Sequence, residues 1–489
     1  MAGKASETLA YAVRGRAIVH FHGELCLALT GVAAVPAVFA AASGAWRFAA
    51  ANASVAAVLG AIWWLSTRRE APSQLRGNEA LVVVATGYLL TALLMTLPLA
   101  SDGLPVADAF LQSMSAITTT GLSTAGNPSG HSDAFLFASA WMQWYGGLVV
   151  IVLAVLLIEP GAAARQLAGT DIDQSDLAAG ARERARWALI VYSGLTFVVF
   201  VVLLALGGGL FDSALYVLSS VSTGGFSPDD GSLAGLPGRP LQAAVMLAAL
   251  AGAIPFSRYH AVGNPARDTG RLRAFFDVET RTLLLLCLAL SGWLVLTRTV
   301  LGDVPWNESL WTAPLLAVSA QTTAGFTPVD IGGLDPASKL GLVLSMFIGG
   351  GLGSTAGGIK VVRLLLLLRL AQLYVLQPAL PRHAVVETRV GGRVFAGPDL
   401  RQVLGVIGVF TSVVIASWAA FLLFGHDPLD ALFEVVSATG TVGLSSGLTS
   451  PSLEEPLKLV LCLDMWMGRL EILAVLVLLH PRTWLGRRL

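Results

Sequence analysis

Charged residues are scarce in this chain. They make up 13% of its 489 residues, whereas hydrophobic residues make up 55%. An average soluble domain carries about 25% charged residues, and a soluble protein of this length needs more polar surface than this chain has to cover its core. The composition therefore excludes an ordinary water-soluble fold and indicates a protein whose outer surface faces membrane lipid.

Cysteine is also scarce, and neither sign of charge is in excess. The three cysteines stand singly in apolar runs, without the spacings of a disulfide framework or a metal site; we expect buried thiols at Cys26, Cys287 and Cys462. Basic and acidic residues number 31 each, so net charge gives no reason to expect a nucleic-acid partner. The pattern H-E-x-x-H is absent, and we expect neither an enzyme nor a resident cofactor.

Long apolar runs are abundant. About 20 such residues cross a bilayer, and ten candidate spans lie near 18–43, 52–66, 80–100, 135–158, 187–207, 240–257, 282–300, 340–370, 402–424 and 457–480. The first run is longer than the 7–15 residues of a signal-peptide core, so we expect a retained helix. Shorter, half-polar segments lie near 108–117, 212–221, 312–321 and 430–439. These suit re-entrant elements, which exist at membrane depth only when buried in protein or lining a watery cavity.

The loops between the spans alternate in charge. Loops after the second, fourth, sixth and eighth spans are rich in arginine, as are both termini, while the alternate loops carry acids such as Asp229, Asp230 and Glu454. The positive-inside rule then places both termini in the cytoplasm, with the protein in the cytoplasmic (inner) membrane. The short segments enter the membrane from outside, where acidic loops attract cations.

The four short segments repeat one pattern without gaps. Each contains a glycine, with threonine two residues before it and serine six residues before it. The glycines are Gly121, Gly225, Gly325 and Gly443; the serines are Ser115, Ser219, Ser319 and Ser437. Thirteen residues before each glycine stands a residue type that caps helix N-termini, namely Asp108, Asp212, Thr312 and Asp430. Such an internal repeat indicates four equivalent units.

The repeated pattern has a physical interpretation. A short helix of about two turns would run inward from each cap, and its C-terminal end carries partial negative charge that favours a cation. The chain would then be extended through Thr-x-Gly, because glycine accepts backbone angles that other residues resist. Rings of carbonyl oxygens that replace an ion's water shell are how potassium filters work. A single glycine is as readily explained by helix packing, but the fourfold repeat favours a filter.

We therefore expect a pore that conducts a monovalent cation, potassium, through a selectivity filter. The residues expected to bind the ion are Thr118, Thr119, Thr120, Gly121, Ser222, Thr223, Gly224, Gly225, Thr322, Thr323, Ala324, Gly325, Thr439, Gly440, Thr441, Val442 and Gly443.

A glycine-rich stretch and one arginine stand out within the later spans. Residues 349–360 read G-G-G-L-G-S-T-A-G-G-I-K, with six glycines in the first ten; each costs about 1 kcal/mol relative to alanine in a helix. We expect an unwound loop beneath the filter, since broken helices at membrane depth line cavities. Arg469 costs at least about 2.5 kcal/mol in lipid unless paired or hydrated. It either has a functional role or pairs with Glu471 or Asp464 in a structural ion pair. Lys360 either belongs to the loop or extends toward the cytoplasm.

These motifs resemble the Trk/Ktr/HKT superfamily of potassium transporters over about residues 80–480. The resemblance is carried by the four filter segments, by the glycine-rich stretch and by M-G-R-L-E from Met467. It implies an all-α polytopic membrane protein, with two N-terminal helices plus four membrane–pore-loop–membrane repeats around a central pore. The expected units are 1–78 for the two helices, and 79–160, 185–260, 280–372 and 400–482 for the repeats.

Within the superfamily, the two spans before residue 80 and the Q-W-Y-G-G run from Gln143 resemble the Trk branch, the membrane subunit of the bacterial Trk potassium uptake system. The fourth filter, A-T-G-T-V-G-L-S, is more similar to the Ktr branch. The resemblance implies a homodimer and a cytosolic, ring-forming, nucleotide-binding regulatory subunit (TrkA-like). It also implies an intramembrane gate, formed by Gly349, Gly350, Gly351, Gly353, Ser354, Thr355, Gly357, Gly358, Lys360 and Arg469.

Two other functions remain open from the sequence. A secondary transporter with alternating access also uses broken helices, although such transporters usually have two inverted halves rather than four like-oriented repeats. A sodium- or proton-coupled cation transporter of the same superfamily would share all of these motifs.

Overall fold

The computed structural model describes residues 12–68, 76–157, 174–263, 275–376, 388–391, 393–395 and 397–485. Most of these residues are α-helical; the strands among them are β1 (Thr388–Val390) and β2 (Arg393–Phe395), paired antiparallel. Most of the arginine-rich loops that suggested the orientation, 69–75, 158–173, 264–274 and 377–387, lie outside the described residues. The two ends of the described chain meet, since Val13 N donates to Thr483 O at 2.9 Å.

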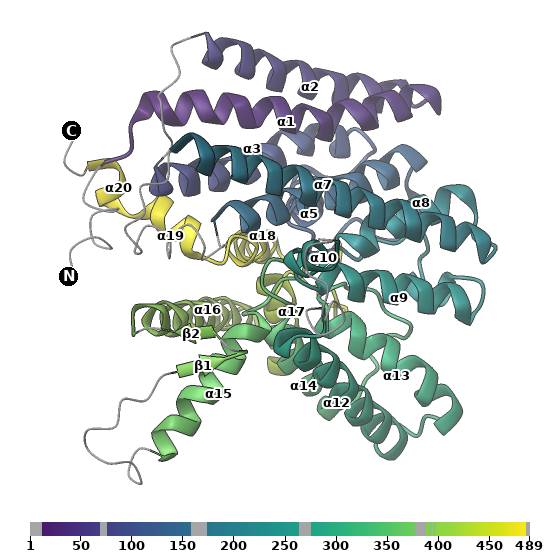
Figure 1. Cartoon of the computed structure of the whole chain (residues 1–489). Helices are drawn as coiled ribbons and strands as arrows, with labels where there is room; N and C mark the ends of the chain where they lie inside the picture. The colour runs from purple at the N-terminus through teal and green to yellow at the C-terminus, as the bar shows by residue number, and fades with distance from the viewer. Residues whose placement is uncertain are drawn as a thin grey trace.

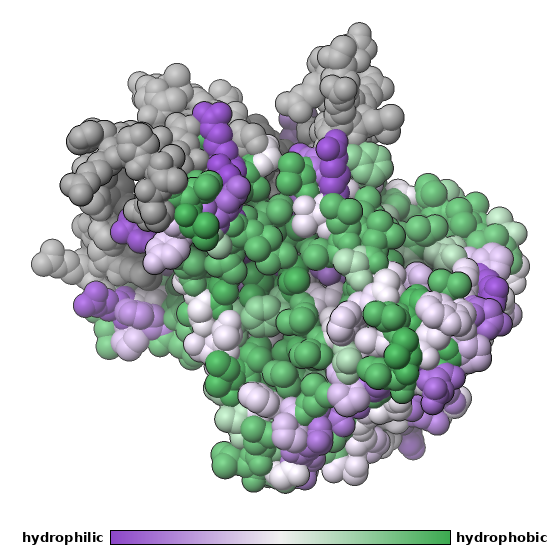
Figure 2. Space-filling view, turned by 90° about the horizontal axis from the view of Figure 1, so that it is seen from below, coloured by the Kyte–Doolittle hydropathy of each residue, from purple (hydrophilic) through white to green (hydrophobic). Residues whose placement is uncertain are grey.

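Seven helices are long and apolar enough to cross a membrane. They are α1 (Gly15–Ala42), α2 (Trp46–Thr67), α3 (Gly77–Ala100), α5 (Asp133–Leu157), α7 (Gln174–Ala205), α12 (Val278–Val300) and α16 (Gly397–Leu423). Each coincides with one of the ten predicted spans. On the face that Figure 2 shows, hydrophobic residues cover the middle and hydrophilic residues lie toward the rim, as expected of a surface that faces lipid. Leu285 and Leu288 of α12, for example, are exposed.

The other three predicted spans are each interrupted. Two helices replace each of them: α9 (Arg239–Ala253) with α10 (Phe256–Gly263), α14 (Pro336–Ile348) with α15 (Val361–Leu376), and α18 (Glu455–Arg469) with α19 (Leu473–Leu479). Pro255 separates the first pair, since proline cannot continue a helix. The glycine-rich stretch separates the second, as its composition predicts. The third break follows from positive φ angles at Glu471 and Ile472, 51° and 63°, and the sequence did not predict it. The chain ends in the short α20 (Pro481–Leu485).

The four short helices are α4 (Val106–Ile117), α8 (Leu210–Val221), α13 (Trp306–Gln321) and α17 (Pro428–Thr439). The predicted N-caps are wrong: the helices begin after Pro105, Gly209, Pro305 and Asp427. Asp108, Asp212 and Asp430 are instead the third helical residues, where a negative charge still favours the helix N-terminus. Helix α13 has 16 residues against 12 in the others, so Thr312 lies inside it. The helices therefore have at least three turns rather than two.

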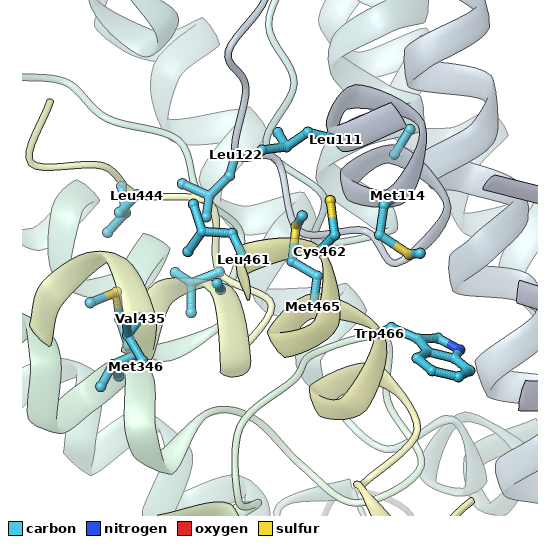
Figure 3. Close-up of a cluster of buried hydrophobic side chains, with 14 of the residues drawn as sticks. Leu111, Met114, Leu122, Met346, Val435, Leu444, Leu461, Cys462, Met465 and Trp466 are labelled. Atoms are coloured by element: carbon cyan, nitrogen blue, oxygen red, sulfur yellow. The ribbon is translucent and has the colours of Figure 1, made fainter. Parts of the chain in front are cut away.

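Each of the four predicted repeats consists of a first helix, a short helix and a second helix: α3, α4 and α5; α7, α8 and α9; α12, α13 and α14; α16, α17 and α18. These four units pack in a closed cycle. Each unit's second helix contacts the short helix of the following unit: α5 with α8, α9 with α13, α14 with α17, and α18 with α4. Helices α1 and α2 pack against each other and against α3 at one side of the molecule (Figure 1). Figure 3 shows the core where the fourth unit meets the first, with Leu111 and Met114 of α4 close to Cys462 and Met465 of α18.

All three cysteines are buried and free, which confirms the prediction of buried thiols.

A candidate ion pathway

The four short helices all end in the same way, immediately before the four Thr-x-Gly segments (119–121, 223–225, 323–325 and 441–443). The N–H groups of Thr120, Gly224, Ala324 and Val442 donate to the carbonyls of Ser115, Ser219, Ser319 and Ser437, at 2.7–2.9 Å. This is the hydrogen bond of a Schellman helix terminus, which needs a left-handed residue just before the donor. That residue is threonine each time, with φ between 50° and 56°. A β-branched residue is strained there, and four such strained positions mark a functional site.

The four glycines of these segments form a ring. All have positive φ, between 75° and 92°. A Cβ on each would overlap with a carbonyl oxygen of the next unit: Gly121 with Gly224, Gly225 with Ala324, Gly325 with Val442, and Gly443 with Thr120. The last contact returns to the first unit, so the ring is closed. Glycine is required at these positions both by the backbone angle and by the close approach.

Oxygen atoms of the Thr-x-Gly segments are buried at this ring. Thr118, Thr119, Thr120, Ser222, Thr223, Thr322, Thr323, Thr439 and Thr441 are all fully buried. The hydroxyls of Thr119 and Thr441 have no hydrogen-bond partner in the described part of the chain, whereas that of Thr223 donates to Ser222 O at 2.7 Å. Unpartnered buried oxygens are costly and are suited to replace the water shell of a cation.

A cavity of about 240 Å³ lies on one side of the ring. Its lining includes all four ring glycines together with His131, Asp229 and Asp230. The Asp230 carboxylate accepts hydrogen bonds from Ser129 N at 2.9 Å and Ser129 Oγ at 2.7 Å, and these bonds lower the pKa of Asp230. The carboxylate therefore stays ionised at neutral pH, which makes this mouth attractive to cations.

The glycine-rich segment (residues 349–360) lies against the other side of the ring. Gly357 N donates to Thr323 Oγ1 at 2.8 Å, and Gly358 N donates to Gly440 O at 3.1 Å. Thr355 Oγ1 donates to Gly252 O at 2.9 Å, and it also reaches Val221 O at the end of α8. The segment thus contacts the second, third and fourth units where their short helices end.

The glycines of this segment are needed for its close packing. Gly349, Gly353 and Gly358 have positive φ. A Cβ on Gly350 would overlap with Ala356, one on Gly351 with Pro255, and one on Gly357 with Gly440 O. The composition that prevents a helix therefore also lets the segment approach the ring. Ser354 is buried, and its hydroxyl donates to Gly351 O at 2.6 Å.

Arg469 contacts the glycine-rich segment rather than a carboxylate. Its Nη1 donates to Thr355 O at 2.7 Å. The ion pairs considered from the sequence are wrong, because Glu471 pairs with Arg363 and Asp464 accepts from Ser417 Oγ at 2.7 Å. Lys360 does not extend toward the cytoplasm either. It is buried, and its ammonium donates back to Ala356 O.

Sequence reasoning missed a set of side chains behind the ring. Three of these side chains stand nine residues before a ring glycine: Gln112, Tyr216 and Glu434. Each forms a hydrogen bond with the serine that stands two residues after the same glycine, at 2.7, 2.8 and 2.6 Å. Glu434, fully buried, also accepts from Ser446 N and from Thr449 Oγ1. The sequence held a signal for these residues: three of the four aligned repeats have a polar residue at this position, and the third has Leu316. These contacts fix the chain where it leaves the ring.

Sequence reasoning also missed the contacts of two glutamines and two ion pairs. Gln143 Nε2 donates to Gly224 O at 2.5 Å, and Gln321 Nε2 donates to Gly349 O at 2.6 Å. Lys339 pairs with Asp430 at 2.7 Å, and Lys458 pairs with Asp108 at 2.6 Å. Each ion pair joins the second helix of one unit to the short helix of the next. The partners are far apart in sequence, so no local pattern could pair them.

One short motif is misleading. Residues 443–447, G-L-S-S-G, match the G-x-S-x-G pattern of hydrolases, whose serine sits on a turn from a strand into a helix. Here the run follows the end of α17, and Ser445 Oγ donates to Glu434 Oε1. The serine is structural.

The chain is similar along most of its length to cation transport proteins. The sequence profile of the TrkH family, described as a cation transport protein, matches residues 46–484. An uncharacterized cation transporter of Methanocaldococcus jannaschii is 30% identical over 423 residues, which are 84% of each chain. The Trk system potassium uptake protein TrkH of Salmonella typhimurium is 28% identical over 487 residues, 96% of this chain and 99% of that protein. The crystal structure of the potassium transporter TrkH from Vibrio parahaemolyticus has a TM-score of 0.83 at 26% identity, and the match covers 96% of this chain and 100% of that one.

Proposed function

The chain belongs to the TrkH family of cation transport proteins, and we propose that it takes up potassium across the cytoplasmic membrane through the ring of Thr-x-Gly segments. The observation that carries the proposal is the closed ring of glycines with buried, unpartnered threonine oxygens at Thr119 and Thr441. Relatives named as potassium uptake proteins cover nearly the whole chain. Membership of this family also agrees with the Trk branch inferred from the sequence.

The electrostatics of the ring favour a cation over an anion. Four helix C-termini approach it, and each carries about half a negative charge. The ionised Asp230 lies at the outer cavity. The four Thr-x-Gly segments offer oxygen ligands and contain no acidic residue, which suits an ion that must enter and also leave. These features support selective conduction through residues 118–121, 222–225, 322–325 and 439–443.

The gate in this proposal is the glycine-rich segment with Arg469. The segment lies directly beneath the ring, and the Arg469 guanidinium is buried against it. A positive charge there opposes a cation in a low-dielectric site, where Coulomb energies are several-fold larger than in water. Opening requires the segment to move, and α15, which begins directly after it at Val361, is the element through which a force from the cytoplasm would act.

We further propose that this force comes from a separate protein. Two copies of this chain in the membrane would bind a cytosolic, ring-forming, nucleotide-binding subunit (TrkA-like). The proposal is supported by the relatives named as parts of a Trk system and by the direct connection of α15 to the glycine-rich segment. Co-purification of the dimer with such a subunit, and gating only in its presence, are the expected results.

Expression in a bacterium that lacks potassium uptake tests the main function. The chain should restore growth at low potassium and should carry rubidium into the cells. The control is the Gly225→Asp variant, whose side chain would overlap with Ala324 of the neighbouring unit. This variant should restore neither growth nor rubidium uptake. If the wild-type protein is present in the membrane and transports no rubidium with or without the cytosolic subunit, the proposed function is wrong.

A further inference from the structure

The carboxamide of Gln143 connects the first unit to the Thr-x-Gly segment of the second. Gln143 lies on α5 and is fully buried. Its Nε2 donates to Gly224 O at 2.5 Å, and its Oε1 accepts from Phe226 N at 3.2 Å. One side chain therefore fixes both residues that flank the ring glycine Gly225. Because one neighbour needs a donor and the other an acceptor, the amide has a single favourable orientation.

Gly224 of the second Thr-x-Gly segment leaves room for the carboxamide of Gln143. Of the four residues that directly precede the ring glycines, only Gly224 lacks a side chain; the others are Thr120, Ala324 and Val442. Its φ is not in the positive range, so the backbone does not require glycine. A Cβ on Gly224 would instead overlap with the carboxamide of Gln143. The absence of a side chain at 224 is therefore explained by the presence of Gln143.

The fixed carbonyl is part of the ring. Gly224 O is the oxygen that lies against Gly121. In the described part of the chain, side-chain donors reach none of the corresponding carbonyls of Thr120, Ala324 and Val442. A carbonyl that accepts an N–H has its direction fixed and one lone pair engaged. One of the four ring carbonyls is therefore restrained by a side chain, and the ring is asymmetric.

We propose that Gln143 is a positioning residue that sets the ion selectivity of the ring. By holding Gly224 and Phe226 it keeps the ring at the width that suits potassium and prevents closure around the smaller sodium ion. The inference rests on the proposed function of the ring as a selectivity filter. Without Gln143, the Gly224 carbonyl is free to turn and the half-buried Phe226 N–H loses its acceptor.

Purified protein in liposomes provides the test. The potassium-to-sodium permeability ratio of Gln143→Leu should fall about fivefold, which corresponds to the ~1 kcal/mol net value of one hydrogen bond. The matched control is Trp144→Phe on the same helix, because Trp144 Nε1 donates to Thr196 Oγ1 at 2.9 Å, away from the ring. This control should keep the wild-type ratio. A wild-type ratio in Gln143→Leu, with potassium flux retained, overturns the proposal.

A pair of compensating substitutions, at Gly224 and Gln143, distinguishes a positioning role of Gln143 from a general loss of folding. Gly224→Ala alone places its Cβ into Gln143 and should reduce potassium flux at least fivefold. Gly224→Ala combined with Gln143→Ala makes room for the new Cβ, and Ala324 of the third unit already occupies the equivalent position. The double variant should recover potassium flux, but its potassium-to-sodium permeability ratio should stay low. A double variant with no more flux than Gly224→Ala, at equal yield, contradicts the proposal. Failure of the wild-type protein to conduct potassium would instead contradict the proposed function.

Discussion

The ring glycines combine a positive φ with a carbonyl oxygen of the neighbouring unit where a Cβ would lie. Gly121→Ser should therefore displace Gly224 O and lower the potassium-to-sodium permeability ratio, while the protein still assembles. Gly126→Ser is the matched control, because Gly126 also has a positive φ, 83°, but has open space around it. Both variants carry the backbone strain of about 1–3 kcal/mol. An unchanged ratio in Gly121→Ser would exclude Gly121 from the filter.

Glu434 behind the ring is a second residue with a defined effect. Its fully buried side chain accepts hydrogen bonds from Ser445, Ser446 and Thr449. Glu434→Leu removes both acceptor oxygens and leaves the buried Ser446 N–H and the Thr449 hydroxyl without their acceptors, at a cost of about 1–3 kcal/mol. The thermal unfolding midpoint should fall. Glu454→Gln, at a partly exposed pair with His426, should change stability by less than about 0.5 kcal/mol. Equal midpoints for the two variants would contradict this role.

At the scale of elements, the glycine-rich segment between α14 and α15 is the part of the pathway expected to move. Arg469→Ala removes both the hydrogen bond to Thr355 O and the positive charge. Basal rubidium flux of the protein without its cytosolic partner should rise, and the potassium-to-sodium ratio should stay the same. Arg298→Ala is the control, since Arg298 is also buried but contacts Thr312 of α13 at 2.5 Å. If Arg469→Ala assembles and its flux equals that of the wild type, the segment is not a gate.

At the scale of the whole molecule, closure of the ring depends on the contact between the fourth and first units. The Lys458–Asp108 pair joins them, and both side chains are less than one-tenth exposed. Lys458→Met leaves a buried carboxylate without its partner, which costs about 3–5 kcal/mol, so the yield of assembled protein and the unfolding midpoint should both fall. Adding Asp108→Leu removes the unpaired charge and should restore much of the loss. A double variant no more stable than Lys458→Met would show that the pair does not hold the units together.

The sequence by itself determined the membrane class, the four units and the interrupted span at 349–360. Each of these depends on local composition or on a repeat within the chain: long apolar runs, four copies of Thr-x-Gly, and glycines too frequent for a helix. Seven predicted spans are continuous helices, because length and hydropathy suffice to form them. Three of the short helices begin earlier than expected because Pro105, Gly209 and Pro305 precede their first turns, and the fourth begins after Asp427 rather than Asp430.

Only the tertiary structure decided which residues meet. Gln143 and Gly224 are 81 positions apart, and Lys458 and Asp108 are 350 apart. Arg469 binds a carbonyl of the glycine-rich segment, whereas the sequence offered it nearby carboxylates. Such contacts arise when the helices of one unit pack on the short helix of the next, and neither periodicity nor spacing along the chain specifies that packing. The residues of the ring are therefore visible in the sequence, while the side chains that fix its geometry become visible only when the four units close around it.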